Sequence, residues 1–599
     1  MMRVADRHIR ALFPSIELSF DGVSISGFEG ESLAACLMAN GFRDFRTTKS
    51  GAARGVFCGM GVCSDCLVEV DGCHNLNACM TPVTEGMNVK SQVDPVELSG
   101  SGKVNLASDP EVETKILRPE ILVLGGGPAG LSAAKAAALA GCEVSLIDER
   151  LSLGGQYFKQ LLKNHVFDDD RHMDQQFKAG RELISEVEAA GVRVYGGALV
   201  WGAFEPMEIC VVEKGRSFIF QPANLIIATG AYERGVPLPG WTLPGFMTTG
   251  AAQTLLRSYR VAPGRKVLVA GNGPLNLQVA AELSDAGVEV VAVAEAAAPM
   301  SLSKLPAMLS AFQQSPDLMF DGLSYLRRLR RARVPLLLGH VVIEASGREA
   351  VESVAVAAVT PEGGVVAGSR RDLAVDAVCV GYGFLPANEI SRALGCRHRF
   401  DPALGSLVVE KDGDCQSSVK GIFIVGDCGG MGGAKAAIEE GFIAGVAAAR
   451  NMRRDVPSGL ARELVARRRR LVSHRRFQRA LWRLFSAPQL DVQLAREDTL
   501  VCRCEEVTLA EIQGSLDGGA CTAGAVKRET RAGMGRCQGR YCGSLITELV
   551  AKHSGIAAEE FSFFAPRPPI KPVPINLLAR ETPDGLTSET VEGSAMEMD

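Results

Sequence analysis

One glycine-rich stretch, residues 121–156, constrains the fold of this chain more than any other feature. Apolar residues lead into G-x-G-x-x-G, then an alanine-rich helical segment and a second apolar run that ends in two acids. These glycines permit a tight turn, close approach of a pyrophosphate to a helix N-terminus, and packing of that helix on the sheet. A carboxylate about 20 residues further on accepts hydrogen bonds from ribose hydroxyls. The stretch predicts a strand–turn–helix–strand unit that binds an adenine dinucleotide through Gly125, Gly127, Pro128, Ala129, Gly130, Asp148 or Glu149, Gly155 and Gln156.

Two later motifs extend this site. The apolar run that ends in Thr229 and Gly230 resembles the strand and turn by which flavoproteins with two dinucleotide folds leave the first fold. A later strand ends before Gly426 and Asp427, and a glycine turn and a helix follow. This helix N-terminus can hold a flavin pyrophosphate, and Asp427 can bond the ribitol. The order predicts one FAD-binding fold with a second fold inserted in it.

A second, incomplete fingerprint follows the first. Gly271 and Gly273 keep the spacing, Asn276 replaces the third glycine, and Glu295 is the acid after the next strand. A glutamate there favours a free ribose hydroxyl, so NAD is preferred to NADP. Two interpretations stay open: a working NAD(H) site, or a structural fold that binds no nicotinamide.

Eight of the seventeen cysteines fall in two tight groups. The first follows an expected helix at 32–40 and has the spacing C-x4-C-x2-C-x12-C. This matches the plant-type [2Fe-2S] pattern, and glycines around it let backbone amides crowd the sulfurs. Zinc is the competing metal. The second, C-x-C-x32-C-x4-C with helical segments between its pairs, suits a compact helical [2Fe-2S] domain. The expected ligands are Cys58, Cys63, Cys66 and Cys79 in the first group, and Cys502, Cys504, Cys537 and Cys542 in the second.

Composition sets the remaining limits. A formal net charge of -5 over 599 residues gives no case for nucleic acid. No signal peptide and no apolar run near the ~20 residues that span a bilayer are found, so a cytoplasmic protein is expected. The arginine-rich segment 459–484 is amphipathic, and peripheral membrane contact stays an alternative to a helical connector packed on the FAD-binding fold.

With these residues in hand, the chain resembles a known group of oxidoreductases. The first cysteine group is similar to the small ferredoxin-like component of hydrogen cyanide synthase and opine oxidases. The motifs GGGPAG, ATGAYERGVPLPGWTLPG, GNGPLN and VGDCGG resemble the larger flavoprotein component of these enzymes, as well as the α subunits of dye-linked proline and hydroxyproline dehydrogenases. The second cysteine group resembles the bacterioferritin-associated ferredoxin domain, and the N-terminal half resembles part of the sarcosine oxidase α subunit.

The resemblance implies a natural fusion of two subunits in an α/β flavoprotein with two dinucleotide-binding domains. The expected order is a β-grasp [2Fe-2S] domain at 1–98, a linker at 99–117, the FAD-binding domain at 118–236 and 375–452, an inserted NAD(P)-binding-like domain at 237–374, a basic helical connector at 453–495, a helical [2Fe-2S] domain at 496–562, and a proline-rich arm with a disordered tail at 563–599.

The resemblance also implies a division of labour. A D-amino-acid-oxidase-like β subunit would oxidise an opine, proline, hydroxyproline or glycine, so no catalytic residue is expected in this chain. This chain, with FAD and two [2Fe-2S] clusters, would pass the electrons to an external quinone, cytochrome or ferredoxin, and an FMN at the subunit interface is allowed. The rival hypotheses are an NAD(P)H-dependent reductase and a redox sensor or scaffold.

Overall fold

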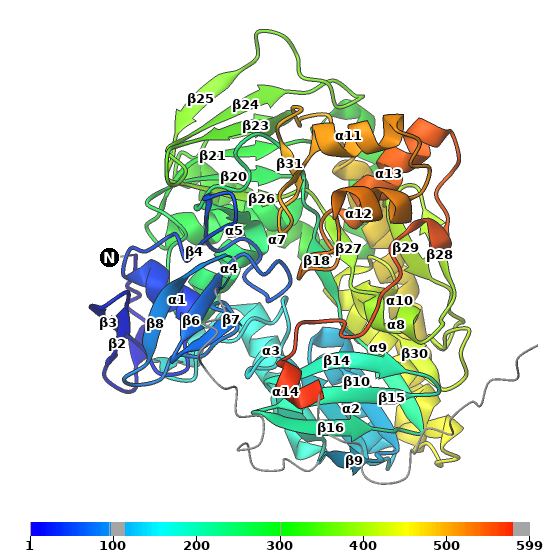
Figure 1. Cartoon of the computed structure of the whole chain (residues 1–599). Coiled ribbons are helices and arrows are strands. Elements are labelled where there is room, and N and C mark those ends of the chain that lie inside the picture. Colours follow the sequence, from blue (N-terminus) through cyan, green and yellow to red (C-terminus); the bar gives the residue numbers. More distant parts are fainter. Residues whose placement is uncertain (1, 95, 97–113, 300, 579–599) are drawn as a thin grey trace, which may run out of the picture.

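The computed structural model describes residues 2–94, 96, 114–299 and 301–578. Most of the expected linker at 99–117 and the acidic tail at 581–599 lie outside these residues. In Figure 1 the N-terminal domain (blue) and the C-terminal helices (orange and red) lie against two central α/β folds.

The N-terminal domain is a mixed sheet that carries one buried helix. Ser32 caps helix α1 (Leu33–Ala39), and every residue of this helix is buried, which explains its purely apolar sequence. Strand β1 (Ile9–Ala11) leaves the domain and pairs with β12 (His165–Phe167). The sheet has the order β3-β2-β8-β4-β5, with β6 paired to β7 and β8, and consists of β2 (Ile16–Phe20), β3 (Val23–Gly27), β4 (Arg46–Thr47), β5 (Ala53–Arg54), β6 (Leu67–Val70), β7 (Cys73–Asn77) and β8 (Asn88–Val93).

The first dinucleotide fold is a parallel sheet built from two distant parts of the chain. Its order is β13-β11-β10-β17-β30, from β13 (Arg193–Gly196), β11 (Val144–Asp148), β10 (Ile121–Leu124), β17 (Asn224–Ile227) and β30 (Ile422–Ile424). Helices α2 (Pro128–Leu139) and α9 (Gly433–Asn451) pack very closely on one another. A Cβ on Gly441 would lie 2.1 Å from the Ala129 carbonyl oxygen, and one on Gly445 would lie 2.3 Å from that of Ala133.

An antiparallel layer and one further helix complete this fold. The layer has the order β14-β15-β16-β9. Its members are β14 (Ala198–Phe204), β15 (Glu208–Glu213), β16 (Arg216–Phe220) and β9 (Lys115–Leu117), and the helix is α3 (Gln175–Ala189).

The inserted fold enters and leaves through one antiparallel pair, β18 (Ala231–Glu233) with β27 (Phe384–Pro386). Its parallel sheet has the order β19-β26-β20-β21-β22. Because β26 (Ala377–Gly381) pairs with both β19 and β20, the fold extends beyond the expected boundary at residue 374. Its other elements are β19 (Phe246–Thr248), α4 (Thr249–Tyr259), β20 (Lys266–Gly271), α5 (Pro274–Asp285), β21 (Glu289–Glu295), α6 (Leu305–Gln314), α7 (Pro316–Arg331), β22 (Leu336–Leu338), β23 (His340–Ser346), β24 (Ser353–Ala358) and β25 (Arg371–Ala374).

The arginine-rich helix α10 (Ser458–Leu484) packs between the two central folds. Its buried Leu460, Leu464 and Leu471 join the core of the first dinucleotide fold. Phe477 and Leu484 instead form a small cluster with Ala311 of α6. Its arginines pair with two buried acids of α9: Arg470 with Glu439 at 3.1 Å and Arg475 with Glu440 at 2.9 Å. These contacts favour the connector interpretation. No helix in the described ranges is long and apolar enough to span a membrane.

The C-terminal domain is small and helical, and an extended arm follows it. The arm returns to the first dinucleotide fold, where Ile570 N–H donates to the carbonyl oxygen of Trp201 on β14 at 2.6 Å (Figure 1). The elements of this region are β31 (Leu500–Cys502), β32 (Val507–Thr508), α11 (Leu509–Asp517), α12 (Ala523–Thr530), α13 (Gly543–Ser554) and α14 (Ile575–Leu578).

Candidate cofactor sites

The first fingerprint forms a tight loop between β10 and α2. Gly125 adopts φ +105°, and a Cβ on Gly130 would lie only 1.8 Å from the Gly125 carbonyl oxygen. No side chain caps the N-terminus of α2. The space beside Gly127 is also open, because a Cβ there would meet only the Gly155 Cα, at 3.8 Å. The free amides at this helix N-terminus therefore fit a pyrophosphate.

The two expected ribose acids lie in different surroundings. Asp148 accepts a hydrogen bond from the Gly126 N–H at 2.6 Å, and burial raises its pKa to about 6. Glu149 instead pairs with Lys571 of the C-terminal arm. Asp148 is thus the acid that faces the fingerprint loop.

The remaining expected FAD contacts gather at the same edge of the sheet. A Cβ on Gly426 would lie 3.0 Å from the Ala129 Cβ, so this turn lies against the start of α2. Asp427 accepts hydrogen bonds from the amides of Gly432 and Gly433 at 2.8 and 2.9 Å, and burial raises its pKa. The structure therefore brings the first fingerprint and the Asp427 turn together. Thr229, just after β17, donates to the Ala387 carbonyl oxygen at 2.7 Å, and Gly230 follows it with φ +71°.

The second fingerprint is well formed despite its missing glycine. Gly273 adopts φ +117°, with open space where a Cβ would stand. Glu295 accepts hydrogen bonds from the amides of Gly273 at 3.0 Å and Ala297 at 2.9 Å, and burial raises its pKa to about 7. Asn276 is buried and donates to the Gly381 carbonyl oxygen at 3.0 Å. The loop therefore fits a dinucleotide as well as the first does.

A buried polar group between the two folds was not predicted from the sequence. Lys159 donates to the Gln253 side chain at 2.8 Å, and Glu233 accepts from the Gly250 amide at 2.9 Å. Burial lowers the pKa of Lys159 and raises that of Glu233, each to about 7. Both residues stand shortly after expected FAD contacts, Gln156 and Gly230, which is the signal that could have found them.

The first cysteine group is one buried cluster of sulfurs ringed by amides. The Cys58 sulfur accepts from the Cys63 N–H at 3.4 Å, and the Cys79 sulfur accepts from the Gly61 N–H at 3.3 Å. The neighbouring Cys58 and Cys66 raise the pKa of the Cys79 thiol well above its usual value, so these three sulfurs lie close together. The chemistry of this donor set fits a [2Fe-2S] cluster, which needs four thiolates. Cys73, which is not among the expected ligands, is exposed.

The second cysteine group is also joined sulfur to sulfur. Cys504 lies 3.9 Å from Cys502 and 3.6 Å from Cys537, between Sγ atoms. Hydrogen bonds from the Cys504 and Cys542 thiols lower the pKa of Cys502 to about 3. The same contacts raise the pKa of Cys504 and of Cys542 well above its usual value, so it is the close approach of the sulfurs that marks this group as a shared ligand set. Among the described residues, no three His, Cys, Asp or Glu side chains are arranged to hold a single metal ion.

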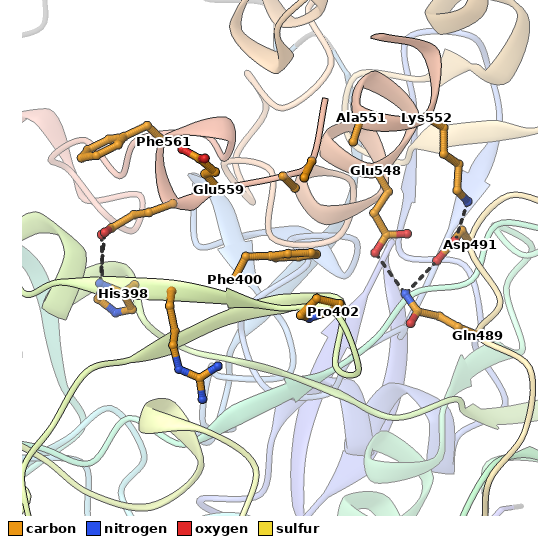
Figure 2. A pocket seen from close by; sticks show the side chains of 14 residues that line it. His398, Phe400, Pro402, Gln489, Asp491, Glu548, Ala551, Lys552, Glu559 and Phe561 are labelled. Carbon is orange, nitrogen blue, oxygen red and sulfur yellow. Dashed lines mark hydrogen bonds and ion pairs between the residues drawn. The ribbon is translucent and has the colours of Figure 1, made fainter. Parts of the chain in front are cut away.

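A cavity of about 820 Å³ lies between the first dinucleotide fold and α13 (Figure 2). Phe400 and Pro402 of the hairpin β28 (His398–Asp401) and β29 (Ser406–Val409) form one side of it. Gln489 joins Asp491 and Glu548 by hydrogen bonds, and burial together with Asp491 raises the pKa of Glu548 to about 8. None of the residues predicted from the sequence lines this cavity.

Three family descriptions match successive parts of the chain. Residues 14–94 match the 2Fe-2S iron-sulfur cluster binding domain. Residues 119–441 match pyridine nucleotide-disulphide oxidoreductase, and residues 500–552 match the BFD-like [2Fe-2S] binding domain. These matches confirm the predicted fold class and the two predicted iron–sulfur domains.

Individual relatives agree with this order. Hydrogen cyanide synthase subunit HcnB of Pseudomonas protegens is 33% identical over 76% of this chain and 96% of its own length. An opine oxidase subunit of Rhizobium meliloti is 32% identical over 77% of this chain and 98% of its own length. The crystal structure of L-proline dehydrogenase from P. horikoshii shares the fold, with a TM-score of 0.69 over 97% of this chain and 100% of that chain, at 22% identity.

Proposed function

The chain belongs to the pyridine nucleotide-disulphide oxidoreductase family, as an FAD-dependent subunit related to HcnB and to the opine oxidase subunit of Rhizobium meliloti, and on this premise we propose that it relays electrons within an amine or amino-acid dehydrogenase complex. A partner, a D-amino-acid-oxidase-like β subunit, oxidises the substrate. This chain takes up the electrons and delivers them to an external acceptor. The names of both relatives describe subunits, which supports a partner.

One observation carries the proposal. One hydrophobic core contains members of both cysteine groups together with residues that follow the Thr229-Gly230 turn. Cys58 and Cys63 of the first group, Cys537 of the second and Tyr232 of β18 are all buried in it. Electron transfer between redox groups requires a short distance between them, which this shared packing supports.

The residues have distinct proposed roles. The amides at Gly127 bind the FAD pyrophosphate, Asp148 holds the adenosine ribose, and Asp427 holds the ribitol. The buried Lys159 and Glu233 hold a proton between the two folds, where they keep bulk water out. When bound, flavin accepts two electrons and releases them singly, and each cluster carries one.

A second candidate function is an NAD(P)H-dependent reductase. The open, positive-φ Gly273 loop and the amide-bonded Glu295 favour it. In that case the inserted fold binds the nicotinamide dinucleotide, and the chain is reduced without a partner.

An anaerobic absorbance titration separates the two candidates. The purified full chain is mixed first with NADH and then with dithionite. Flavin and cluster bands that persist with NADH and bleach with dithionite support the relay, and co-purification then identifies the β subunit. Rapid bleaching by NADH supports the reductase, and a spectrum without flavin or cluster bands contradicts both.

A further inference from the structure

A buried ion pair joins the two cysteine groups. Asp65 lies between Cys63 and Cys66 in the sequence, and Arg503 lies between Cys502 and Cys504. The Arg503 guanidinium donates to one oxygen of Asp65, from Nε at 2.8 Å and from a terminal nitrogen at 2.7 Å. The side chains of Asp65 and Arg503 are only 0% and 6% exposed, respectively. Each partner of this pair is therefore flanked by expected ligands of a different cluster.

The surroundings of Arg503 come from the first cysteine group and from the inserted fold. The guanidinium lies 3.8 Å above the Phe57 ring and 4.6 Å above the Trp241 ring, and it donates to the Trp241 carbonyl oxygen. Phe57 directly precedes Cys58. On the other side, Trp241 donates from its indole nitrogen to the Leu500 carbonyl oxygen at 2.8 Å, just before Cys502. Aromatic rings therefore cover the guanidinium of Arg503, and its N–H groups donate to Asp65 and to the Trp241 carbonyl oxygen.

Asp65 is equally fixed on its own side. Its backbone N–H donates to the Cys63 sulfur at 3.5 Å, and its carbonyl oxygen accepts from Arg46 at 3.1 Å. The Asp65 backbone is therefore bound to a sulfur that is an expected ligand, and the buried Arg46 lies 3.7 Å from the carboxylate oxygen that Arg503 does not contact. A third contact spans the groups: the Phe57 and Tyr541 rings lie 5.3 Å apart, and each ring belongs to the residue before an expected ligand, Cys58 or Cys542.

Stability alone does not explain such a pair. Burying two charges costs desolvation energy that their attraction only partly offsets, and apolar residues of similar size are often as stable. The pair is also not the sole polar contact between the two domains, because Glu506 accepts hydrogen bonds from Thr48 at 2.7 Å and from the Ser50 hydroxyl at 2.6 Å. The position of the pair between two redox sites indicates an electrostatic role instead.

We propose that the Asp65–Arg503 pair sets the direction of electron transfer between the two clusters. This inference rests on the proposed relay. A carboxylate within the first group disfavours an added electron there, and a guanidinium within the second favours one. With both clusters bound, an added electron would therefore be more stable on the C-terminal cluster than on the N-terminal cluster. Asp65 and Arg503 are positioning residues, since they act through the ligands beside them.

The test is a redox titration of the full chain followed by electron paramagnetic resonance. Cys79→Ser and Cys542→Ser variants assign the two cluster signals. In the wild type, the C-terminal cluster is expected to have the higher reduction potential. Asp65→Asn should raise the potential of the N-terminal cluster most, and Arg503→Gln should lower that of the C-terminal cluster most. Both changes narrow the gap between the potentials.

Two controls separate charge from docking. Ser50→Ala removes a hydrogen bond to Glu506 between the domains without changing any charge, and Lys552→Gln removes a positive charge on α13 that pairs with Asp491, away from the Asp65–Arg503 pair. Neither should change the gap. If Arg503→Gln loses its C-terminal cluster, Arg503→Lys keeps the charge and should keep the gap.

The outcomes for the inference and for the proposed function are distinct. Potentials that stay fixed in both Asp65→Asn and Arg503→Gln overturn the inference, even where flavin reduction still reaches both clusters. A wild-type chain whose reduced flavin passes no electron to either cluster overturns the relay, and the inference with it.

Discussion

The two dinucleotide folds of this chain use the same strand, turn and acid but solve the packing of the next helix differently. In the first, Gly130 lets α2 touch the Gly125 carbonyl oxygen. In the inserted fold, Asn276 occupies the equivalent position, donates to the Gly381 carbonyl oxygen and accepts from the Thr249 hydroxyl at 2.8 Å. The Asn276 side chain therefore connects α5 to the neighbouring elements by hydrogen bonds. In the first fold, α2 instead contacts the fingerprint loop directly.

The difference teaches what the third glycine of the fingerprint is for. It serves the packing of helix on loop and not the dinucleotide itself. Asn276 is therefore a structural replacement, and its presence is no argument against nicotinamide binding. The two folds differ in what supports the loop, and they share the acid that faces it.

The largest expected effect comes from Gly130→Ala. The new Cβ would overlap the Gly125 carbonyl oxygen, and α2 cannot retreat because Gly441 and Gly445 hold α9 against its other side. Such an overlap in a closed core should cost about 4 kcal/mol or more, at the upper end for single substitutions. We expect loss of cooperative thermal unfolding and of bound FAD, measured by circular dichroism and by flavin absorbance. A stable, FAD-loaded variant would mean that the two loops tolerate a side chain equally.

Gly127→Val should remove FAD and spare the fold. Gly127 has φ −80°, which any residue adopts, and its Cβ position is free of clashes, so the cost to stability is small. The side chain would occupy the space where the pyrophosphate approaches the amides. The ratio of FAD to protein should fall to near zero, with the far-ultraviolet spectrum unchanged. Stoichiometric FAD in this variant would disprove the assigned site. Gly273→Val is not a matched variant for the second fingerprint, because Gly273 has φ +117° and a valine there would strain the backbone.

Asn276→Ala should have an intermediate effect, confined to the inserted fold. The Gly381 carbonyl oxygen and the Thr249 hydroxyl would lose their partner in a buried site, which costs about 1–3 kcal/mol. Denaturant unfolding should show this loss, while FAD content stays at the wild-type level. A drop in FAD content would show that the two folds are coupled more tightly than their separate loops indicate.

Sequence patterns predicted the local features of both folds well, because these depend on neighbouring residues. Ser32 and Asn40 bound α1 as expected, and the fingerprint spacing placed the acids opposite the loops. The family matches confirm both iron–sulfur domains. The roles of individual residues at the FAD and cluster sites stay predictions.

Contacts between distant segments of the chain could not be predicted, because no pattern in the sequence marks them. Arg503 and Asp65 are 438 residues apart, and an arginine between two cysteines looks like any solvated side chain until the domains dock. The same holds for Lys571, which is far from Glu149 in the sequence but forms an ion pair with it. Asp148, and not Glu149, then accepts the hydrogen bond from the fingerprint loop. Only the tertiary structure shows which of two adjacent acids faces the loop.

The smallest expected effect is a pH dependence that compares the two acids directly. Burial raises the folded-state pKa of Glu295 from 4.5 to about 7 and that of Asp148 from 3.8 to about 6. A raised folded-state pKa means that the folded chain binds more protons, so each group loses its stabilising contribution as the pH rises through its own window. The wild-type Tm minus the Glu295→Gln Tm should fall between pH 4.5 and about 7. The matching difference for Asp148→Asn should fall mostly below pH 6.

Bound dinucleotide sharpens this comparison. Ribose hydroxyls that donate to a carboxylate favour its charged form and lower its pKa, which flattens the pH dependence. FAD should flatten the pH dependence of the wild-type Tm minus the Asp148→Asn Tm. The comparison is between protein stripped of flavin and the same protein reloaded with FAD. Saturating NADH should flatten the Glu295 difference only if the inserted fold binds it. An unchanged Glu295 profile in NADH would make the inserted fold structural, and the relay would then depend on its partner for every electron.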